Sequence, residues 1–501
     1  MRSLVGGATL CAPMSTSDPF HSATTSRLND RALTKVVATI GPASEDRVGE
    51  LIDAGLSVAR LNFSHGTPEE HQERIQKIRA AAQERMVAVG ILGDLPGPKM
   101  RTGKFPEGSV ELVLDQQVKV IAGKGMAKEG EVWVDVRDLV VAVKRGHRIL
   151  LADGLVECVA EEVARDWVIA RVTRAGVVGN NKGVHLPDSD VEYELPTAED
   201  RSWIEFAVEN GVDMLGISFV GRASELELIR ALAPGLMLVS KIERKSALAN
   251  LEEILDATDG VMVARGDLGV EVKLEQLPMA QKHLLSVALA AGKFTITATE
   301  MLESMIQVSR PTRAEVTDVA NAILDGTDAV MLSAETAVGS YPALTVSTMT
   351  GIASAVEASD RFRESSRLAF RQAEADFSNA TALAAVQVAE ALGMARIVCF
   401  TETGNTVRLI SRYRPNCSIV ALSPNRSAVQ HMTVLRNVMP ILFRREPSLE
   451  DMLFMAAEML VVRCLANYGD QIVFVAGVPP GVARSTNVMK LHRIGEEVKL
   501  H

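Results

Sequence analysis

Two short apolar runs in the middle of the chain each end in charged residues that could do chemistry together. The first run ends in Lys241 and Glu243, and the second ends in Arg265, Gly266 and Asp267. Packing alone explains such strand ends poorly. The two carboxylates are hard oxygen ligands for a divalent cation, while an ammonium and a backbone amide beside glycine can hold anionic groups. The pattern predicts a site that binds a phosphorylated, carboxylated substrate through Mg²⁺.

These residues belong to a longer alternation of strand-like and helix-like segments. The strand-like runs span residues 35–41, 58–64, 89–95, 214–220, 237–243, 260–267, 294–299 and 329–336, with helix-period segments at 46–53, 68–85, 197–209, 222–231, 247–255, 277–291 and 313–324. Eightfold alternation predicts a parallel (β/α)₈ TIM barrel, an α/β fold whose active site lies at the C-terminal strand ends. Polar residues stand at nearly every such end: Asn62, Ser64, Asp94, Ser218, Lys241, Glu243, Arg265, Asp267, Thr299, Ser333 and Glu335.

Two further domains are expected around this barrel. Residues 98–196 interrupt the alternation with short Val- and Gly-rich runs between turn signals, which predicts a small β-barrel lid domain inserted at the rim. Residues 359–501 alternate helix and strand patterns and predict a C-terminal α/β regulatory domain of doubly wound type. The catalytic barrel is then expected over residues 27–97 and 197–358.

The first 26 residues differ in composition from the rest. They are rich in Ser and Thr and hold one acid, Asp18, and one arginine, Arg2. We interpret residues 1–26 as a disordered extension, or as upstream of a true start at Met14. A transit peptide is usually richer in arginine, so an organellar location is the alternative to the expected cytoplasmic one.

Overall composition excludes several classes of function. The net charge of −10 and the scarcity of aromatic residues argue against nucleic-acid binding and against attraction to anionic membranes. Five scattered cysteines without a CxxC pair argue against a disulfide framework or a zinc site. No apolar run reaches the ~20 residues needed to span a bilayer.

A possible effector site follows the first strand of the C-terminal domain. Hydroxyl groups and a glycine precede a helix N-terminus there, a place that can hold phosphate: Thr401, Thr403, Gly404, Asn405 and Thr406. Nine arginines and no lysine lie between residues 396 and 463, which favours an anion. The alternative is an ordinary strand-to-helix turn with a helix cap.

Eight segments, taken in order, give the chain a close resemblance to pyruvate kinases from about residue 33 to the C-terminus. They span residues 35–44, 59–66, 93–101, 240–243, 262–269, 297–305, 310–315 and 331–335. One segment alone would be a weak signal, whereas eight in family order with the inserted domain in place are specific. The resemblance implies transfer of the phosphoryl group of phosphoenolpyruvate to ADP, giving pyruvate and ATP, with Mg²⁺ or with Mn²⁺ as a substitute.

The resemblance also implies roles for the residues at the barrel mouth. Glu243 and Asp267 match the Mg²⁺ ligands, and the backbone amides of Gly266 and Asp267 would receive the substrate carboxylate. Lys241 matches the lysine that neutralises the transferring phosphoryl group, and Arg60 matches a phosphate-binding arginine. Thr299 matches the threonine beside the enolate carbon. Either Thr299 or the pair of Ser333 and Glu335 would relay the proton that forms pyruvate.

The resemblance is weaker at the positions that bind the nucleotide. Positions that border ADP in the family correspond to Pro42, Asn62, His65, Arg101 and Lys182. Asp153 either faces the metal–nucleotide complex or shapes its own turn. His185 stands where the family usually has Asn, and Glu300 replaces the usual Gln.

A departure near the third strand bears on the monovalent cation. Many family members need K⁺: a threonine helps to ligate the ion, and a nearby glutamate demands such a cation. Here Leu95 and Lys99 take those two positions. A fixed ammonium can stand in for K⁺, so we predict K⁺-independent activity, with Asn62, Ser64 and Asp94 as a remnant of the ion site.

The family resemblance further implies a homotetramer and a phosphorylated activator. Helix 312–324 and the C-terminal strands could supply the subunit contacts. Loop 478–487 resembles the rim of the effector pocket, where Arg484 and Ser485 would grip a sugar phosphate or a nucleotide phosphate. No nucleic-acid or membrane partner is expected.

Two rival interpretations stay open. One is another Mg²⁺-dependent barrel enzyme, such as an aldolase of oxoacids, which would lack both additional domains. The other is a non-catalytic regulatory paralogue, which should have lost one of the residues that carry the chemistry. None of Arg60, Lys241, Glu243, Asp267 and Thr299 is lost.

Overall fold

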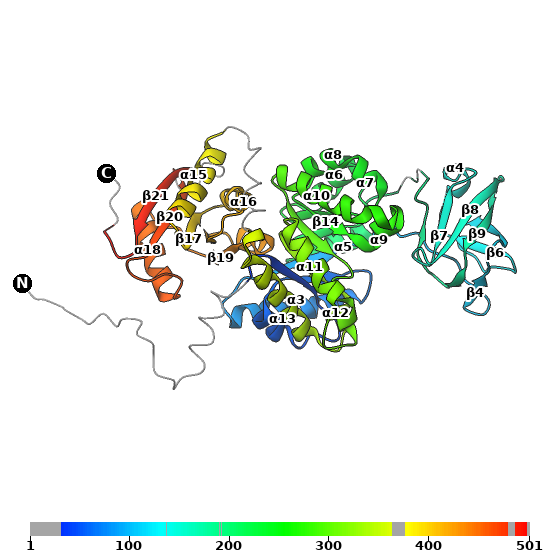
Figure 1. The fold of residues 1–501 in the computed structure, drawn as a ribbon, viewed down its shortest axis with the longest axis horizontal. Coiled ribbons are helices and arrows are strands. Elements are labelled where there is room, and N and C mark those ends of the chain that lie inside the picture. Colours follow the sequence, from blue (N-terminus) through cyan, green and yellow to red (C-terminus); the bar gives the residue numbers. More distant parts are fainter. Residues whose placement is uncertain are drawn as a thin grey trace, which may run out of the picture.

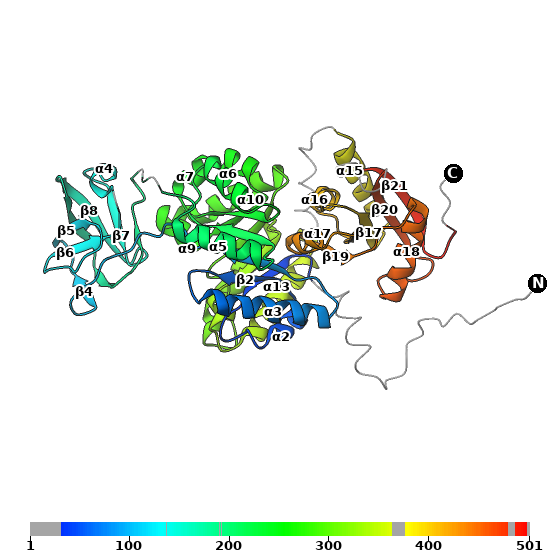
Figure 2. The ribbon, with the colours of Figure 1, turned by 180° about the vertical axis from the view of Figure 1, so that it is seen from behind.

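The computed structural model describes residues 32–136, 138–189, 191, 193–362, 376–478 and 486–497. Three folded units lie in a row (Figures 1 and 2). A closed barrel occupies the middle, the inserted domain lies at one end and the C-terminal domain at the other. The expected N-terminal extension, residues 1–26, lies outside the described residues.

Eight parallel strands close the barrel, as the sequence predicts. In spatial order it contains β1 (Lys35–Thr39), β16 (Ala329–Leu332), β15 (Phe294–Ala298), β14 (Gly260–Ala264), β13 (Met237–Ile242), β12 (Met214–Ile217), β3 (Gly90–Asp94) and β2 (Leu56–Asn62). The helices around it are α2 (Val48–Ala54), α3 (Pro68–Glu84), α5 (Ala198–Glu209), α6 (Ala223–Leu232), α7 (Lys245–Ala249), α8 (Leu251–Ala257), α9 (Arg265–Glu271), α10 (Leu277–Ala290), α11 (Arg313–Leu324), α12 (Ala334–Ala337) and α13 (Pro342–Glu357), with short 3₁₀ turns η1 (Leu274–Gln276) and η2 (Glu303–Ile306).

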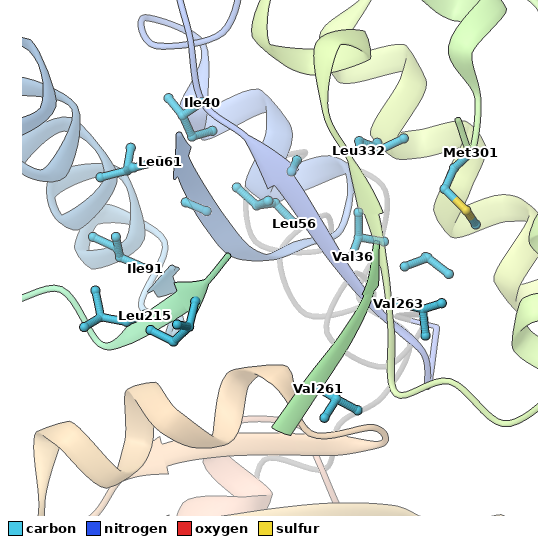
Figure 3. Close-up of a cluster of buried hydrophobic side chains, with 14 of the residues drawn as sticks. Val36, Ile40, Leu56, Leu61, Ile91, Leu215, Val261, Val263, Met301 and Leu332 are labelled. Carbon is cyan, nitrogen blue, oxygen red and sulfur yellow. The ribbon is translucent and has the colours of Figure 1, made fainter. Parts of the chain in front are cut away.

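The strands hold the barrel together by the period-two alternation of their side chains. Val36 and Ala38 of β1 point outward into the layer beneath the helices, whereas Val37 points into the barrel interior. Figure 3 shows the outward layer, in which Leu56, Leu61 and other strand residues form one buried cluster. This apolar layer fixes the strands, so their polar C-terminal ends are held at defined positions.

All eight predicted strands end one to four residues earlier than expected, and in two of them this changes how the site residues are presented. β14 stops at Ala264, so that Arg265 and Asp267 lie in the first turn of α9. β16 stops at Leu332, and Glu335 lies in α12. The apolar run ends at these points and the following residues no longer alternate, so the strand gives way to a helical turn.

The predicted helix 247–255 is divided into α7 and α8 at Asn250. The side-chain amide of Asn250 donates a hydrogen bond to the carbonyl of Gly221 at 2.8 Å. The break therefore lies at the residue that makes this contact with a distant part of the chain.

The inserted domain is built mainly from strands, with one short helix, α4 (Leu139–Ala142), that the sequence did not predict. Its main sheet has the order β11 (Val184–His185), β7 (Arg148–Leu151), β8 (Val156–Val163), β9 (Trp167–Arg174), β5 (Gln117–Ala122) and β6 (Glu131–Val134), and a ribbon pairs β10 (Gly176–Gly179) with β4 (Ser109–Leu112). Buried valines and leucines fill the space within this domain.

One carboxylate ties together the two chain segments that connect this insert to the barrel. Asp200, which is fully buried, accepts hydrogen bonds from the amide of Gly97 at 3.0 Å and from the amide of Thr197 at 2.9 Å. Thr197 in turn caps α5 by accepting from the Asp200 amide. The outgoing and returning segments are therefore anchored at one point of the rim.

The C-terminal domain is doubly wound, as expected. Its sheet runs β19 (Val438–Leu442), β18 (Ser418–Ser423), β17 (Arg396–Phe400), β20 (Gln471–Gly477) and β21 (Thr486–Arg493), with only β21 antiparallel. Helices α15 (Phe377–Ala391) and α16 (Asn405–Arg412) cover one face and α18 (Leu449–Val462) covers the other, while α17 (Arg426–His431) precedes β19.

This domain also closes the bottom of the barrel. The short 3₁₀ helix η4 (Met432–Val434) contacts β1, β2 and β3. Met432 and Val434 share one buried cluster with the barrel-interior residues Val37 and Met214. The two domains thus have a continuous apolar core.

None of the helices in the described ranges is both long enough and apolar enough to cross a membrane.

Candidate active site

An ion-pair network occupies the C-terminal ends of four neighbouring barrel strands. The guanidinium of Arg60, on β2, contacts the carboxylate of Asp94 at 2.7 Å. The ammonium of Lys241, on β13, lies 3.2 Å from Asp94 and 2.8 Å from Glu243. It donates a hydrogen bond to the hydroxyl of Ser218 at 2.7 Å. The sequence predicted these polar strand ends, and the fold brings them into contact.

Mutual attraction keeps Lys241 and Asp94 ionised despite their burial. Burial alone would lower the pKa of Lys241, but the carboxylates of Asp94 and Glu243 outweigh it and raise that pKa. Burial would raise the pKa of Asp94, but Lys241 and Arg60 hold it below the usual carboxyl range. A lysine held permanently as an ammonium can stabilise negative charge that develops on a bound group.

Glu243 differs from Asp94 in its surroundings. Burial, and the nearby charge of Asp267, raise the pKa of Glu243 to about 7 against the opposing effect of Lys241. One Glu243 oxygen accepts a hydrogen bond from the Phe219 amide at 2.7 Å. The other, Oε1, is buried and lies 2.8 Å from the ammonium of Lys241. An oxygen that faces an ammonium rather than a backbone amide lies where positive charge is favoured.

These residues fit a divalent cation that is held only partly by the protein. Among the described residues, no group of three or more His, Cys, Asp or Glu side chains has the spacing of a metal site. Glu243 and Asp267 would therefore provide two ligands and leave the others to water and substrate. Mg²⁺ is commonly bound this way, through one or two carboxylates plus substrate oxygens.

Thr299 and Gly266 form a second contact at the barrel mouth. The amide of Gly266 donates to the hydroxyl of Thr299 at 2.8 Å, and that hydroxyl donates to the carbonyl of Ala298 at 2.5 Å. Thr299 has a φ of 68°, in the left-handed region that L-residues rarely adopt. A Cβ on Gly266 would meet only Thr299, at 3.6 Å, so the protein leaves space beside this backbone.

Ser333 and Glu335 follow the neighbouring strand β16, and the carboxylate of Glu335 bonds to nearby backbone amides. The buried carboxylate of Glu335 accepts hydrogen bonds from the Ser333 amide at 2.6 Å and from the Leu302 amide at 3.3 Å. Both bonds go to backbone, so in this geometry Glu335 holds two loops together.

The residues matched to the nucleotide are spread over the rim and the lid. Pro42 and His65 are exposed on barrel loops, and the carboxamide oxygen of Asn62 accepts from the Ser64 amide at 3.2 Å. Arg101 donates to the carbonyl of Asn181 at 3.0 Å, next to the exposed Lys182.

Lys99 pairs with the lid rather than with the proposed remnant of an ion site. Its ammonium lies 3.5 Å from the carboxylate of Asp153. Asp94 is already paired with Arg60 and Lys241. Within the described ranges, Lys99 makes no other ion pair.

Two polar residues near the site were not predicted from the sequence. Thr39, at the end of β1, accepts a hydrogen bond from Arg60 at 2.9 Å, and its strand-end position could have identified it. Glu271 lies on α9 one helical turn after Asp267 and approaches His185 to 3.6 Å. The i, i+4 spacing of Asp267 and Glu271 was the available signal.

The predicted effector turn is partly described. Gly404, with a φ of 87°, caps α16, and its amide donates to the hydroxyl of Thr401 at 2.9 Å. The hydroxyls of Thr406 and Thr486 lie 2.6 Å apart. Thr403 is exposed and Asn405 is half-buried, whereas the predicted Arg484 and Ser485 lie outside the described residues.

Comparison with known proteins agrees with this geometry. The pyruvate kinase barrel-domain model matches residues 31–346, and the pyruvate kinase alpha/beta-domain model matches residues 379–492. A pyruvate kinase of Sporosarcina psychrophila is 41% identical over 472 residues, covering 92% of this chain and 80% of its own length. A pyruvate kinase of Methylorubrum extorquens is 40% identical over 468 residues, covering 93% and 98%. With two family models and relatives that span both the barrel and the C-terminal domain, the chain belongs to the pyruvate kinase family.

Proposed function

We propose that this chain transfers the phosphoryl group of phosphoenolpyruvate to ADP at the mouth of the barrel, and that Lys241 provides the main charge stabilisation. The observation that carries the proposal is the buried ammonium of Lys241, held between Asp94 and Glu243 and bonded to Ser218. Phosphoryl transfer proceeds through a loose transition state with negative charge on the equatorial oxygens. An ammonium fixed in place before the reaction stabilises that charge without reorganisation.

Neighbouring residues would hold the substrate around this ammonium. Arg60 would bind the phosphate, since its guanidinium is already oriented by Asp94 and Thr39. The open backbone at Gly266 would receive the substrate carboxylate, because the protein itself does not need a glycine there. Bound at Glu243 and Asp267, Mg²⁺ or Mn²⁺ would supply positive charge to the substrate oxygens.

Thr299 is a better candidate than Ser333 with Glu335 for delivering the proton to the enolate. Transfer of the phosphoryl group leaves the enolate of pyruvate, whose terminal carbon takes a proton. The hydroxyl of Thr299 lies beside the open Gly266 backbone and would have to turn away from Ala298 to reach a substrate. Glu335 is buried and committed to two backbone amides.

Pyruvate release from phosphoenolpyruvate and ADP tests this proposal directly. The reaction should require Mg²⁺ and should fall at least a hundredfold in Lys241→Met, because a positioned charge of this kind is worth ~10²–10³ in rate. Lys245→Met is the matched control, since Lys245 is exposed on α7 four residues later. Folded chain that binds ADP but releases no pyruvate would instead support the regulatory paralogue.

The same assay decides whether K⁺ is needed. We propose that it is not, because Lys99 already places an ammonium at the hinge between lid and barrel, 3.5 Å from Asp153. In tetramethylammonium buffer, added KCl should leave turnover unchanged, whereas Lys99→Glu should lose activity that KCl partly restores. Strong stimulation of the unsubstituted chain by KCl would overturn the Lys99 argument.

Regulation and assembly complete the proposal. A phosphorylated activator would bind the turn at Thr401–Thr406, where the left-handed Gly404 opens α16. Sedimentation should give a homotetramer. The double variant Thr403→Ala and Ser485→Ala should lose any activation, while its basal turnover should stay unchanged. Activation that persists in this double variant would place the effector elsewhere. We also propose that the inserted domain spans residues 98–196 and that the C-terminal domain begins at residue 359.

A further inference from the structure

His185 lies between the lid and the barrel helix that carries a proposed metal ligand. It sits on β11, where Val184 belongs to the buried core of the lid. Because neighbouring strand residues point to opposite faces, the His185 ring faces away from that core and toward α9. The ring is 2% exposed, and its Nε2 has no hydrogen-bond partner.

Three carboxylates surround this ring. Nε2 lies 4.0 Å from Asp153 Oδ1 of the lid and 4.0 Å from Asp267 Oδ1 of α9. Nδ1 lies 3.6 Å from Glu271 Oε1, also on α9. Each ring nitrogen faces at least one acceptor, so either tautomer of a neutral imidazole can donate to a carboxylate. The distances exceed those of hydrogen bonds by about 1 Å.

Packing holds the participants in these positions. A Cβ on Gly183 would come within 2.0 Å of the Asp153 carboxylate, so glycine leaves room for that side chain beside β11. A Cβ on Gly154 would meet Val270 of α9 at 3.2 Å, so the lid turn rests on the same helix. The turn that carries Asp153 therefore lies against the helix that carries Asp267.

We propose that His185 is a positioning residue for the metal-binding carboxylate, and that it links the lid to the barrel. When the lid closes, Nε2 donates to Asp267 and leaves the other oxygen of that carboxylate free for the cation. Residues that orient a metal ligand in this way typically change metal affinity 10- to 100-fold. The proposal rests on the proposed function, in which Asp267 holds Mg²⁺.

Binding of Mn²⁺ alone, measured by electron paramagnetic resonance without substrates, tests the role separately from catalysis. His185→Leu removes both donors while filling the space, and we expect Mn²⁺ to bind about tenfold more weakly. His185→Gln keeps a donor near the position of Nε2 and should bind within about threefold of the unsubstituted chain. His283→Leu, on the exposed face of α10, is the matched control.

The kinetic readout separates positioning from a structural role. His185→Leu should raise the Mg²⁺ concentration for half-maximal pyruvate release about tenfold, with less effect on the rate at saturating Mg²⁺. Unchanged Mn²⁺ affinity in His185→Leu, or equal losses in His185→Leu and His185→Gln, would overturn the proposal. If His185→Leu does not fold, His185→Ala serves in the same comparison. Mn²⁺ binding without pyruvate release in the unsubstituted chain would overturn the proposed function instead.

Discussion

Lys241 and its partners combine a structural role with the catalytic role that we propose for the lysine. The ammonium is buried with two carboxylates, and each of these has a further partner, Arg60 for Asp94 and the Phe219 amide for Glu243. Paired charges avoid most of the cost of burying an isolated ion. The same arrangement places Glu243 Oε1 2.8 Å from the ammonium and keeps the lysine charged.

Removing the lysine charge should therefore affect stability as well as rate. Lys241→Met leaves two buried carboxylates without their shared cation, so we expect a loss of about 3–5 kcal/mol in the free energy of unfolding. Urea denaturation monitored by circular dichroism would measure it. Lys245→Met should change the same free energy by less than about 0.5 kcal/mol, and an equal loss in both variants would contradict the argument.

Asp94 should make the protein sensitive to acid. Its pKa is lowered in the folded state, so it stabilises the fold at neutral pH and loses this contribution as the pH falls below the ordinary carboxyl range. Stability measured from about pH 6 to about pH 3 should fall less steeply in Asp94→Asn than in the unsubstituted chain. Identical slopes would mean that the pKa of Asp94 is the same in the folded and the unfolded protein.

Glu243 should make metal binding weaken as the pH falls. Because its pKa is raised to about 7, the free protein holds a proton there that a cation must displace. Mn²⁺ should bind more weakly at about pH 6 than at about pH 8, and binding near pH 6 should release a proton. Titration calorimetry in two buffers of different ionisation enthalpy would measure how many protons are released when Mn²⁺ binds. Affinity that does not change over this range would contradict the raised pKa.

At the scale of elements, the lid connection depends on one helix N-terminus. Thr197 and Asp200 cap α5 reciprocally, and the second oxygen of Asp200 holds the outgoing segment at Gly97. A capping interaction that usually stabilises only a helix here also anchors both connections of the lid. The lid can then move without losing its attachment point.

Asp200→Ala tests this anchor. It removes the Asp200 half of the capping box and leaves the partly buried amides of Gly97 and Thr197 without their acceptor, so we expect a loss of about 1–3 kcal/mol in stability. Limited proteolysis should also cut the lid connections faster than in the unsubstituted chain. Glu199→Ala, exposed in the same helical turn, is the control, and equal proteolysis of the two variants would rule out the anchor.

The elements also show what sequence could and could not predict. The eight apolar runs predicted the barrel because buried parallel strands read as continuous apolar segments. The ends of those strands were less certain, since Arg265 and Ser333 follow the apolar residues without a turn signal and their backbone starts new helices. The contact of His185 with α9 depends on how two domains meet, and the contact of Lys99 with Asp153 joins two distant parts of the inserted segment. No local pattern encodes either contact.

At the scale of the whole molecule, a buried ion pair joins the C-terminal domain to the barrel. Arg414, just after α16, contacts Asp328 at 2.6 Å, and both side chains are nearly inaccessible to solvent. Asp328 directly precedes β16, which leads to Ser333. The effector turn at the start of α16 and the barrel mouth are thus connected through one helix, one ion pair and one strand.

Arg414→Met should uncouple the two domains. The substitution leaves the Asp328 carboxylate buried without its cation, so we expect about 3–5 kcal/mol of destabilisation. Calorimetry should resolve two unfolding transitions where the unsubstituted chain gives one. Arg201→Met, exposed on α5, should behave as the unsubstituted chain, and a single cooperative transition in Arg414→Met would argue against the coupling.

The floor of the barrel has a consequence for the order of events during synthesis. Met432 and Val434 complete the cluster around Val37 and Met214, yet they leave the ribosome only after all eight strands have been made. Until η4 arrives, the nascent barrel exposes an apolar opening at its base. Nascent chains that stall before residue 432 should therefore bind chaperones more than completed chains do, because exposed apolar surface promotes association.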